Sequence, residues 1–237
     1  MTGSLNNLKQ HHDLICRYRD LLEEVDGWFR GAMARFPEQI ACTTGCSHCC
    51  RGLFDITLLD GLLVQAGFAQ LPADLRERVL DRVSGSVATV RRTWPDFDAP
   101  WLLNSYPEDE YDAAMPDEDE TPCVLLDDDG RCLIYDHRPM TCRLHGIPHR
   151  DSSGEVLFDE WCSLNFTTLD PLRQPDLQFH FSEIFTQEQL LFRELARRLT
   201  GQPLNELDTL IPTALLIDFA HFTLPEQLWT SLPNGPS

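Results

Sequence analysis

The sequence predicts a mainly α-helical chain with one small β-hairpin. Apolar residues recur at helical spacing in several segments, and two short β-prone runs flank an Asp-Gly turn. No repeat, low-complexity tract or clean linker interrupts the 237 residues, and 42% of them are hydrophobic, enough to bury a core without disulfides. We therefore expect a single domain over residues 1–237.

The first helix is expected within residues 5–36. Apolar residues from Leu14 to Met33 keep helical spacing over about five turns, and Pro37 ends the pattern. Cys16 lies on this helix, where we expect a small buried thiol.

Two further helices are expected after a cysteine-rich loop. Thr57 is the predicted N-cap of the first, and Gly67 is its predicted stop. The second carries apolar residues from Leu75 to Trp94 on one face, although Gly85 inside it weakens the pattern. The acidic, proline-punctuated stretch that follows has no periodicity and predicts a long loop.

The β-hairpin is expected from two runs, residues 123–126 and 132–135, joined by three aspartates and a glycine. The turn lacks the alternately spaced carboxylates and the closing glutamate of a calcium loop.

A C-terminal helical segment is expected over residues 180–222. Thr186 and Gln189 form a predicted capping box, and Gly201 is the stop of that helix. A last helix is expected from about Pro212 to Phe222, with the proline in its first turn.

The charge balance excludes two classes of partner. The formal net charge of -19, from 38 acidic and 19 basic residues, repels nucleic acid and anionic lipid, so we expect no nucleic-acid and no membrane partner. The first residues lack an export signal, and the chain has no run of about 18 uncharged apolar residues. We expect a cytoplasmic protein, in which reducing conditions leave thiols free for metals or redox chemistry.

Eight of the nine cysteines fall into two sets along the sequence, one within residues 42–50 and one within residues 123–162. Gly45 lets the loop that carries the first set turn its side chains inward. Deprotonated sulfurs that converge in this way bind metal ions. Reactive or regulatory thiols are the alternative. The predicted ligands are Cys42, Cys46, Cys49, Cys50, Cys123, Cys132, Cys142 and Cys162. Helices would then frame a cysteine-rich metal centre.

Charged neighbours accompany these cysteines. Arg51, Arg131 and Arg143 are each adjacent to a cysteine, where their guanidinium groups would offset thiolate charge; the alternative is that they are ordinary surface arginines. Three histidines, His48, His137 and His145, lie in or beside the motifs and are expected to support the centre rather than to bind the metal.

The motifs "CTTGCSHCC" and "GRCLIYDHRPMTCR", with a last lone cysteine, resemble the YkgJ-type cysteine-cluster family, a zinc- or iron-chelating domain with a CxxCxxCC pattern. The resemblance covers residues 42–162, between the helical segments 5–36 and 180–222. It implies that these cysteines bind metal or an iron-sulfur cluster. For most members it implies no defined reaction.

The choice between zinc and a 4Fe-4S iron-sulfur cluster depends on Cys49 and Cys50. Successive side chains diverge, so two adjacent cysteines serve two nearby centres, or two metals of one cluster, more naturally than one small ion. This favours iron-sulfur. The x3 and x2 spacings also resemble the radical-SAM signature, but the helices and acidic loop that follow do not predict its barrel.

Three functions remain open. The first is a metal-binding protein, with metal ions as partners, that carries electrons to a redox or protein partner or stores metal. The second is an iron-sulfur enzyme resembling the flagellin lysine N-methylases, although no Gly-rich loop for S-adenosylmethionine is present and no nucleophile–base pair can be assigned. The third is a zinc-stabilised interaction module whose acidic loop, around residues 108–120, docks a basic partner, unless that loop is only a solvated surface.

Overall fold

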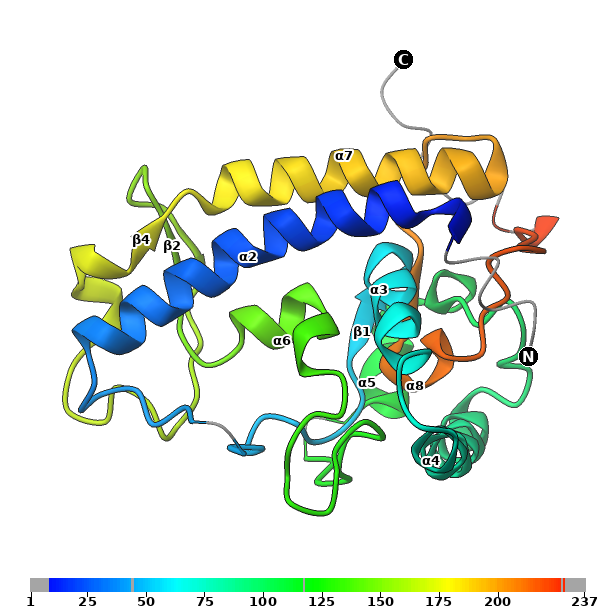
Figure 1. The fold of residues 1–237 in the computed structure, drawn as a ribbon, viewed down its shortest axis with the longest axis horizontal. Coiled ribbons are helices and arrows are strands. Elements are labelled where there is room, and N and C mark those ends of the chain that lie inside the picture. The colour runs from blue at the N-terminus through cyan, green and yellow to red at the C-terminus, as the bar shows by residue number, and fades with distance from the viewer. Residues whose placement is uncertain (1–8, 44, 117, 227, 229–237) are drawn as a thin grey trace.

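Two long antiparallel helices, α2 (His12–Arg35) and α7 (Phe181–Thr200), form one side of the molecule in the computed structural model (Figure 1). The structure describes residues 9–43, 45–116, 118–226 and 228. Leu14, Tyr18 and the other apolar residues of the predicted pattern as far as Val25 are buried, whereas Phe29 and Met33 are half-buried and the buried face continues through Trp28 and Ala32. Exposed ion pairs of Arg198 with Asp13 and of Arg17 with Glu194 join the two helices.

Helix α3 (Leu58–Phe68) is buried on nearly all sides and packs beside α2 and α7. Thr57 is its N-cap, as predicted, because its side-chain oxygen accepts a hydrogen bond of 3.1 Å from the Asp60 N–H. The predicted stop at Gly67 is wrong, since the helix continues to Phe68. Gly67 is instead a packing position: an added Cβ would lie 2.7 Å from the His137 Cβ.

Helix α4 (Ala73–Thr93) is amphipathic. Its valines at positions 79, 83, 87 and 90 are buried, and it packs against α8 (Ile211–Ala214) and α5 (Tyr111–Ala114). The acidic stretch after it is a loop with short helical turns: α5 and the 3-10 helices η1 (Leu103–Ser105) and η2 (Glu108–Glu110).

The described residues also form two small sheets, one of two strands and one of three. Strand β1 (Asp55–Thr57) pairs antiparallel with β5 (Asp208–Leu210), with Ile56 opposite Thr209. In the second sheet, β2 (His149–Asp151) lies between β3 (Val156–Phe158), which is antiparallel to it, and β4 (Gln178–Phe179), which is parallel. The mainly α fold class with small β elements is therefore confirmed.

The predicted hairpin is wrong as a pair of strands. Residues 123–126 and 132–135 meet through a single bridge, Leu126 with Cys132, flanked by a Leu133 N–H to Leu125 C=O hydrogen bond. Tyr135 begins the 3-10 helix η3 (Tyr135–His137), so the second run turns away from the first. The turn itself lies where it was predicted.

The C-terminal segment also differs from the prediction. Thr186 is inside α7, where its hydroxyl donates to the Ser182 carbonyl oxygen, so it is not an N-cap. Asp151 of β2 supplies a hydrogen-bond acceptor to the first turn of α7, because its carboxylate accepts from the Ser182 N–H at 2.9 Å. Gly201, at φ +78, does end the helix. Helix α8 starts with Pro212 in its first turn but ends at Ala214.

Cys16 is exposed on α2, with its sulfur 3.6 Å from a ring nitrogen of His12, so the expectation of a buried thiol is wrong. The remaining short elements are α6 (Met140–Leu144) and the 3-10 helices η4 (Pro171–Arg173) and η5 (Pro175–Leu177). Within the described residues, no helix combines the length and apolar character needed to cross a membrane.

Candidate metal centre

The first four cysteines lie on the loop between α2 and β1. Two tight turns shape this loop: the Cys46 N–H donates to the Thr43 carbonyl at 2.9 Å, and the Cys50 N–H donates to the Ser47 carbonyl at 3.1 Å. Gly45 between them has φ +88, in the left-handed region that glycine adopts at little cost. All four thiols are half-buried.

Cys123 and Cys132 reach this loop through backbone pairing. The Cys123 N–H donates to the Cys50 carbonyl at 3.0 Å. The turn after Cys123 packs so closely that a Cβ added at Gly130 would lie 3.2 Å from the Ser47 Oγ. Residues far apart in the sequence are therefore held side by side by main-chain contacts.

Cys142 is placed by α6, which is fixed to both α2 and α3. The Met140 N–H, in the first turn of α6, donates to the Asp60 carboxylate at 2.9 Å. Arg143 is buried and forms an ion pair with Asp26 of α2, and Arg138 pairs with the same carboxylate at 2.7 Å. These anchors leave Cys142 little freedom to move.

Cys162 is placed by a buried asparagine that the sequence analysis did not single out. The Asn165 side chain accepts from the Ala41 N–H at 2.8 Å, donates to the Gly146 carbonyl at 2.7 Å and contacts the Cys42 sulfur at 3.4 Å. A Cβ added at Gly146 would lie 3.6 Å from the Cys42 sulfur and 3.8 Å from the Cys162 Cβ. Asn165 thus joins the two ends of the cysteine-rich segment.

The thiols interact in two groups. Burial raises the pKa of Cys42, and the neighbouring Cys46, Cys162 and Cys49 thiols raise it further. We name Cys42, Cys46 and Cys162 the first group.

The second group consists of Cys123, Cys132 and Cys142. Burial raises the pKa of Cys142 well above its ordinary value, and Cys123, Cys132 and Cys49 add to that effect. Burial also raises the pKa of Cys123, to about 11. Burial and like-charge repulsion keep these thiols neutral without a cation.

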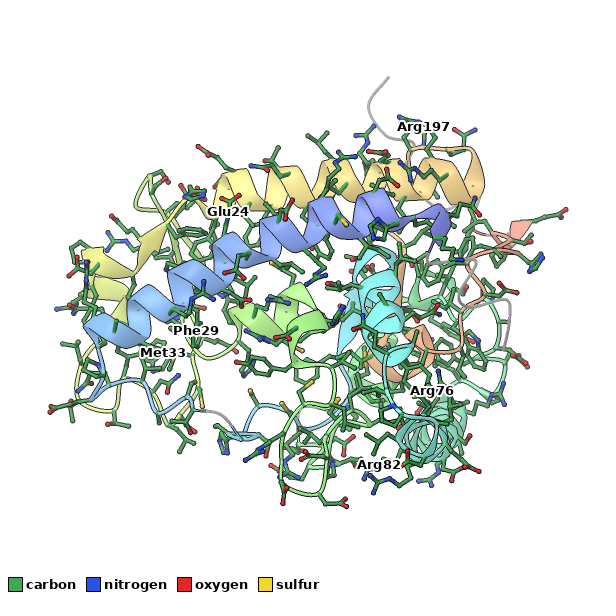
Figure 2. All side chains as sticks on the ribbon, in the orientation of Figure 1. Glu24, Phe29, Met33, Arg76, Arg82 and Arg197 are labelled. Atoms are coloured by element: carbon green, nitrogen blue, oxygen red, sulfur yellow. The ribbon has the colours of Figure 1, made fainter. Side chains whose placement is uncertain are left out.

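Cys49 interacts with a member of each group, and its side chain is hydrogen-bonded to that of Cys50, which is the main reason that its pKa is raised. Cys49 is therefore near both groups, and the backbone of Cys50 is joined to the second group by the hydrogen bond from the Cys123 N–H. Figure 2 shows several sulfur atoms gathered below α6. As placed, no three Cys, His, Asp or Glu side chains among the described residues are close enough to hold a metal ion.

The predicted arginine neighbours have separate surroundings. Arg131 is exposed. Besides Asp26, Arg143 donates to two carbonyl oxygens, those of Arg138 and Asp136, both at 3.1 Å. Arg51 lines a cavity beside Cys123.

The three histidines lie at the edges of the cysteine-rich region. His48 is 3.5 Å from the Ser163 hydroxyl, and His137 is 3.2 Å from the Gln70 amide nitrogen. His145 packs edge-on against Phe54.

A buried hydrogen-bonded triad lies behind α6. The Tyr18 hydroxyl is 2.7 Å from the Asp60 carboxyl and 2.8 Å from the Glu188 carboxyl. The hydroxyl carries one proton and can donate to only one carboxylate, so the other carboxyl must hold a proton of its own. Burial raises the pKa of Glu188 to about 8 and that of Asp60 to about 6, so Glu188 is the protonated partner near neutral pH.

The donor set suits soft or borderline metals. Thiolates are the preferred ligands of zinc and of iron-sulfur clusters, and the eight thiols other than that of Cys16 equal the demand of two four-thiolate centres. Arg138 and Arg143 form ion pairs with Asp26 rather than with the sulfur atoms, so they hold the backbone beside Cys142 and leave its thiol free to bind a metal.

Comparison with known proteins agrees with the cysteine pattern. A family model named CxxCxxCC, described as "Putative zinc- or iron-chelating domain", matches residues 41–163. Neither the curated proteins nor the solved structures include a significant match. The matched region begins just before Cys42 and ends just after Cys162, so it contains both thiol groups and the adjacent pair Cys49 and Cys50. The chain belongs to the CxxCxxCC family of zinc- or iron-chelating domains.

Proposed function

We propose that this chain holds two adjacent metal centres, each through four thiolates. The observation that carries the proposal is that Asn165 and Gly146 bring Cys42 beside Cys162, while a backbone hydrogen bond joins Cys123 to Cys50; the mutual effects of the thiols on their pKa values agree with these two groups. One cysteine of the adjacent pair, Cys49 and Cys50, completes the first group and the other completes the second. Successive side chains point in different directions, which suits two neighbouring centres better than one.

Iron-sulfur clusters, of the 4Fe-4S type, are the proposed occupants, and electron transfer is the proposed role. An iron-sulfur cluster takes four cysteines, and when bound it supplies one-electron redox chemistry tuned by burial and hydrogen bonds. Two neighbouring clusters provide a short route for an electron to a redox partner. The residues of this chain position the thiolates: Asn165 holds the first group, and Asp26 and Asp60 hold α6 in the second.

Anaerobic purification followed by metal analysis, absorption and Mössbauer spectroscopy tests the occupants. Iron-sulfur clusters give iron and acid-labile sulfide in equal amounts, together with visible absorption. A colourless protein with two zinc ions would contradict the iron-sulfur assignment but leave the two thiolate centres in place. A folded, metal-free protein after expression in metal-replete medium would overturn both.

Single substitutions test the grouping. Cys42→Ser is expected to lose the first centre and keep the second, and Cys142→Ser is expected to do the reverse, so each retains about half of the metal. Cys16→Ser is the matched control, because that thiol is exposed and belongs to neither group. Complete loss of metal in both Cys42→Ser and Cys142→Ser would instead indicate a single shared centre.

A further inference from the structure

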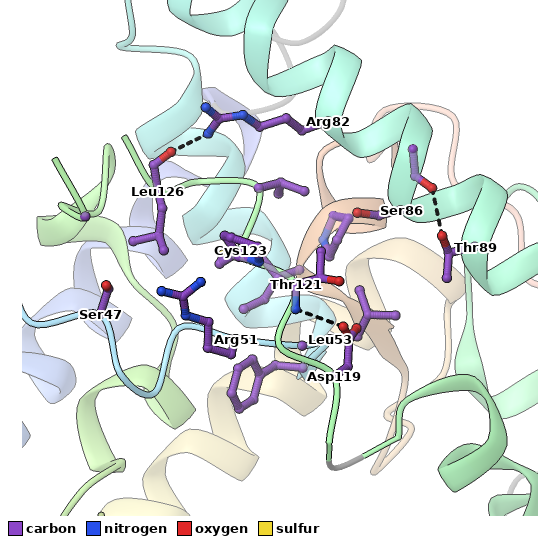
Figure 3. A pocket seen from close by; sticks show the side chains of 18 of the residues that line it. Ser47, Arg51, Leu53, Arg82, Ser86, Thr89, Asp119, Thr121, Cys123 and Leu126 are labelled. Carbon is purple, nitrogen blue, oxygen red and sulfur yellow. Dashed lines mark hydrogen bonds between the residues drawn. The ribbon is translucent and has the colours of Figure 1, made fainter. Parts of the chain in front are cut away.

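A cavity of about 580 Å³ lies between α4 and the cysteine-bearing loops, within the size range of small-molecule sites (Figure 3). Arg82, Gly85, Ser86 and Thr89 form one wall, a single stripe along α4. The cysteine loop and residues 119–130, including Cys123, form the opposite wall. The cavity therefore adjoins the second thiol group.

The acidic side chains in these walls are already engaged. The Asp127 carboxylate accepts from the Asp129 N–H at 2.9 Å and from the Arg131 N–H at 2.7 Å, which holds the turn. The Asp119 carboxylate accepts from the Thr121 N–H at 2.9 Å. Internal backbone hydrogen bonds thus use these two carboxylates.

Arg82 is engaged as well. Its guanidinium donates to the Leu126 carbonyl oxygen and lies 3.4 Å from the Asp128 carboxylate, which Arg78 also approaches at 3.4 Å. The third acidic group of the wall is therefore shared between two arginines, and Arg82 is tied to the loop opposite it.

Arg51 differs from the other charged groups of the cavity. Within the part of the chain that the structure describes, no hydrogen bond or ion pair engages its guanidinium group. Figure 3 shows its side chain extending from the cysteine loop toward the side where Ser47, Cys123 and Leu126 lie. A half-buried guanidinium without a partner, in a chain of net charge -19, indicates a site for an anion.

The other lining groups limit the kind of anion. Leu53, Phe54, Val124 and Ile211 give the cavity apolar surface suited to a hydrocarbon body. Three aspartates in the walls would repel a doubly charged phosphate more strongly than a singly charged carboxylate. A carboxylate also matches the planar fork of one guanidinium in a bidentate contact.

We propose that this cavity binds a small monocarboxylate with an apolar body, its carboxylate on Arg51 and its body against the apolar wall. The ligand lies beside Cys123, so it would be within reach of the second thiol group. Binding requires Arg51 and open space, not a bound metal, so the proposal stands or falls separately from the metal centres.

Isothermal titration of the full chain with acetate, benzoate and 4-phenylbutyrate tests the proposal. Affinity is expected to rise along the series as more apolar surface is buried, and the neutral 4-phenylbutyramide is expected to bind at least about tenfold more weakly than the acid. Arg51→Gln should weaken 4-phenylbutyrate binding by about tenfold or more. Arg92→Gln removes the same charge from an exposed position of α4 outside the cavity and should leave affinity unchanged.

A second variant tests the space rather than the charge. Gly85 lines the cavity, and a Cβ added there meets no atom within 4 Å, so Gly85→Leu places a side chain at the cavity wall and should abolish binding while metal content stays unchanged. Failure of all three carboxylates to bind, equal binding of the amide, stronger binding of inorganic phosphate, or unchanged affinity in Arg51→Gln would each overturn the proposal. Loss of metal in Arg51→Gln would assign Arg51 to the metal centre instead.

Discussion

Glu188 holds a proton that it would release in water, because burial and, after it, the nearby Asp60 carboxyl raise the pKa of its carboxyl group. Its pKa is raised from 4.5 to about 8, so the folded state binds this proton more tightly than the unfolded chain. The resulting stability is complete below pH 4.5 and is lost as pH rises through about 8.

Glu188→Gln is therefore expected to flatten the pH dependence of stability. The glutamine amide can donate to the Tyr18 oxygen as the protonated acid does, without a proton to lose. Between pH 5 and pH 8 the wild type should lose on the order of 3 kcal/mol of unfolding free energy that the variant keeps, measured by urea unfolding. Glu183→Gln, on the exposed side of the same helix, should retain the wild-type slope; parallel slopes for Glu188→Gln would contradict the assignment.

Asn165 is the residue on which the first thiol group depends most. Asn165→Ala leaves the Ala41 N–H and the Gly146 carbonyl without their partner, which should cost about 1–3 kcal/mol of unfolding free energy. Metal bound by the first group should fall, while the second group keeps its metal. Asn104→Ala removes an asparagine whose hydrogen-bond partners, Asp208 and Glu206, lie outside the cysteine-bearing segments, and should lower stability without changing metal content. Equal metal loss in both variants would contradict a local role.

At the scale of elements, replacing two helical glycines with alanine is expected to change the free energy of unfolding in opposite directions. Gly67→Ala places a methyl group 2.7 Å from the His137 Cβ and 3.0 Å from the Ile134 Cβ, so η3 must shift, and a loss of about 1–3 kcal/mol is expected. Gly85→Ala meets no atom within 4 Å and should stabilise α4 by up to about 1 kcal/mol, because alanine has the higher helix propensity. Chemical denaturation measures both; a neutral Gly67→Ala would show that η3 is loosely packed.

The sequence predicted elements well where a local signal decides them. The valines of α4 and the Thr57 cap act within one or two turns, so periodicity and capping rules identified both helices. The predicted capping box at Thr186 was wrong because Asp151 accepts the hydrogen bond from the first turn of α7. Asp151 lies in strand β2, far from α7 in the sequence, so the residues around the helix start give no sign of it. The hairpin failed because Cys123 gives its N–H to Cys50 rather than to the facing run.

At the scale of the whole molecule, the family match covers all eight predicted cysteines, but their role as ligands stays a prediction, and spacing alone did not predict which of them lie near one another. Cys162 joins Cys42 and Cys46 although it is distant from them in the sequence, and only the folded chain brings them together. Spacing rules describe neighbouring ligands and carry no information about such long-range contacts. Arg51 was read as a neighbour of the thiols, and only the tertiary structure shows it lining a cavity with α4.

The metal centres are expected to stabilise one half of the molecule more than the other. They would tie together the loop at 41–50, residues 121–133, α6 and the segment around Cys162, whereas the α2–α7 interface uses apolar residues and ion pairs without any of the eight cysteines. Metal removal by a chelator should lower the Tm and speed amide exchange in these loops, since bound metal contributes directly to folding free energy. The helical signal in the far-UV circular dichroism spectrum, to which α2 and α7 contribute, should persist. Loss of the helical signal together with the metal would instead show that the metal centres and the helix pair unfold as one cooperative unit.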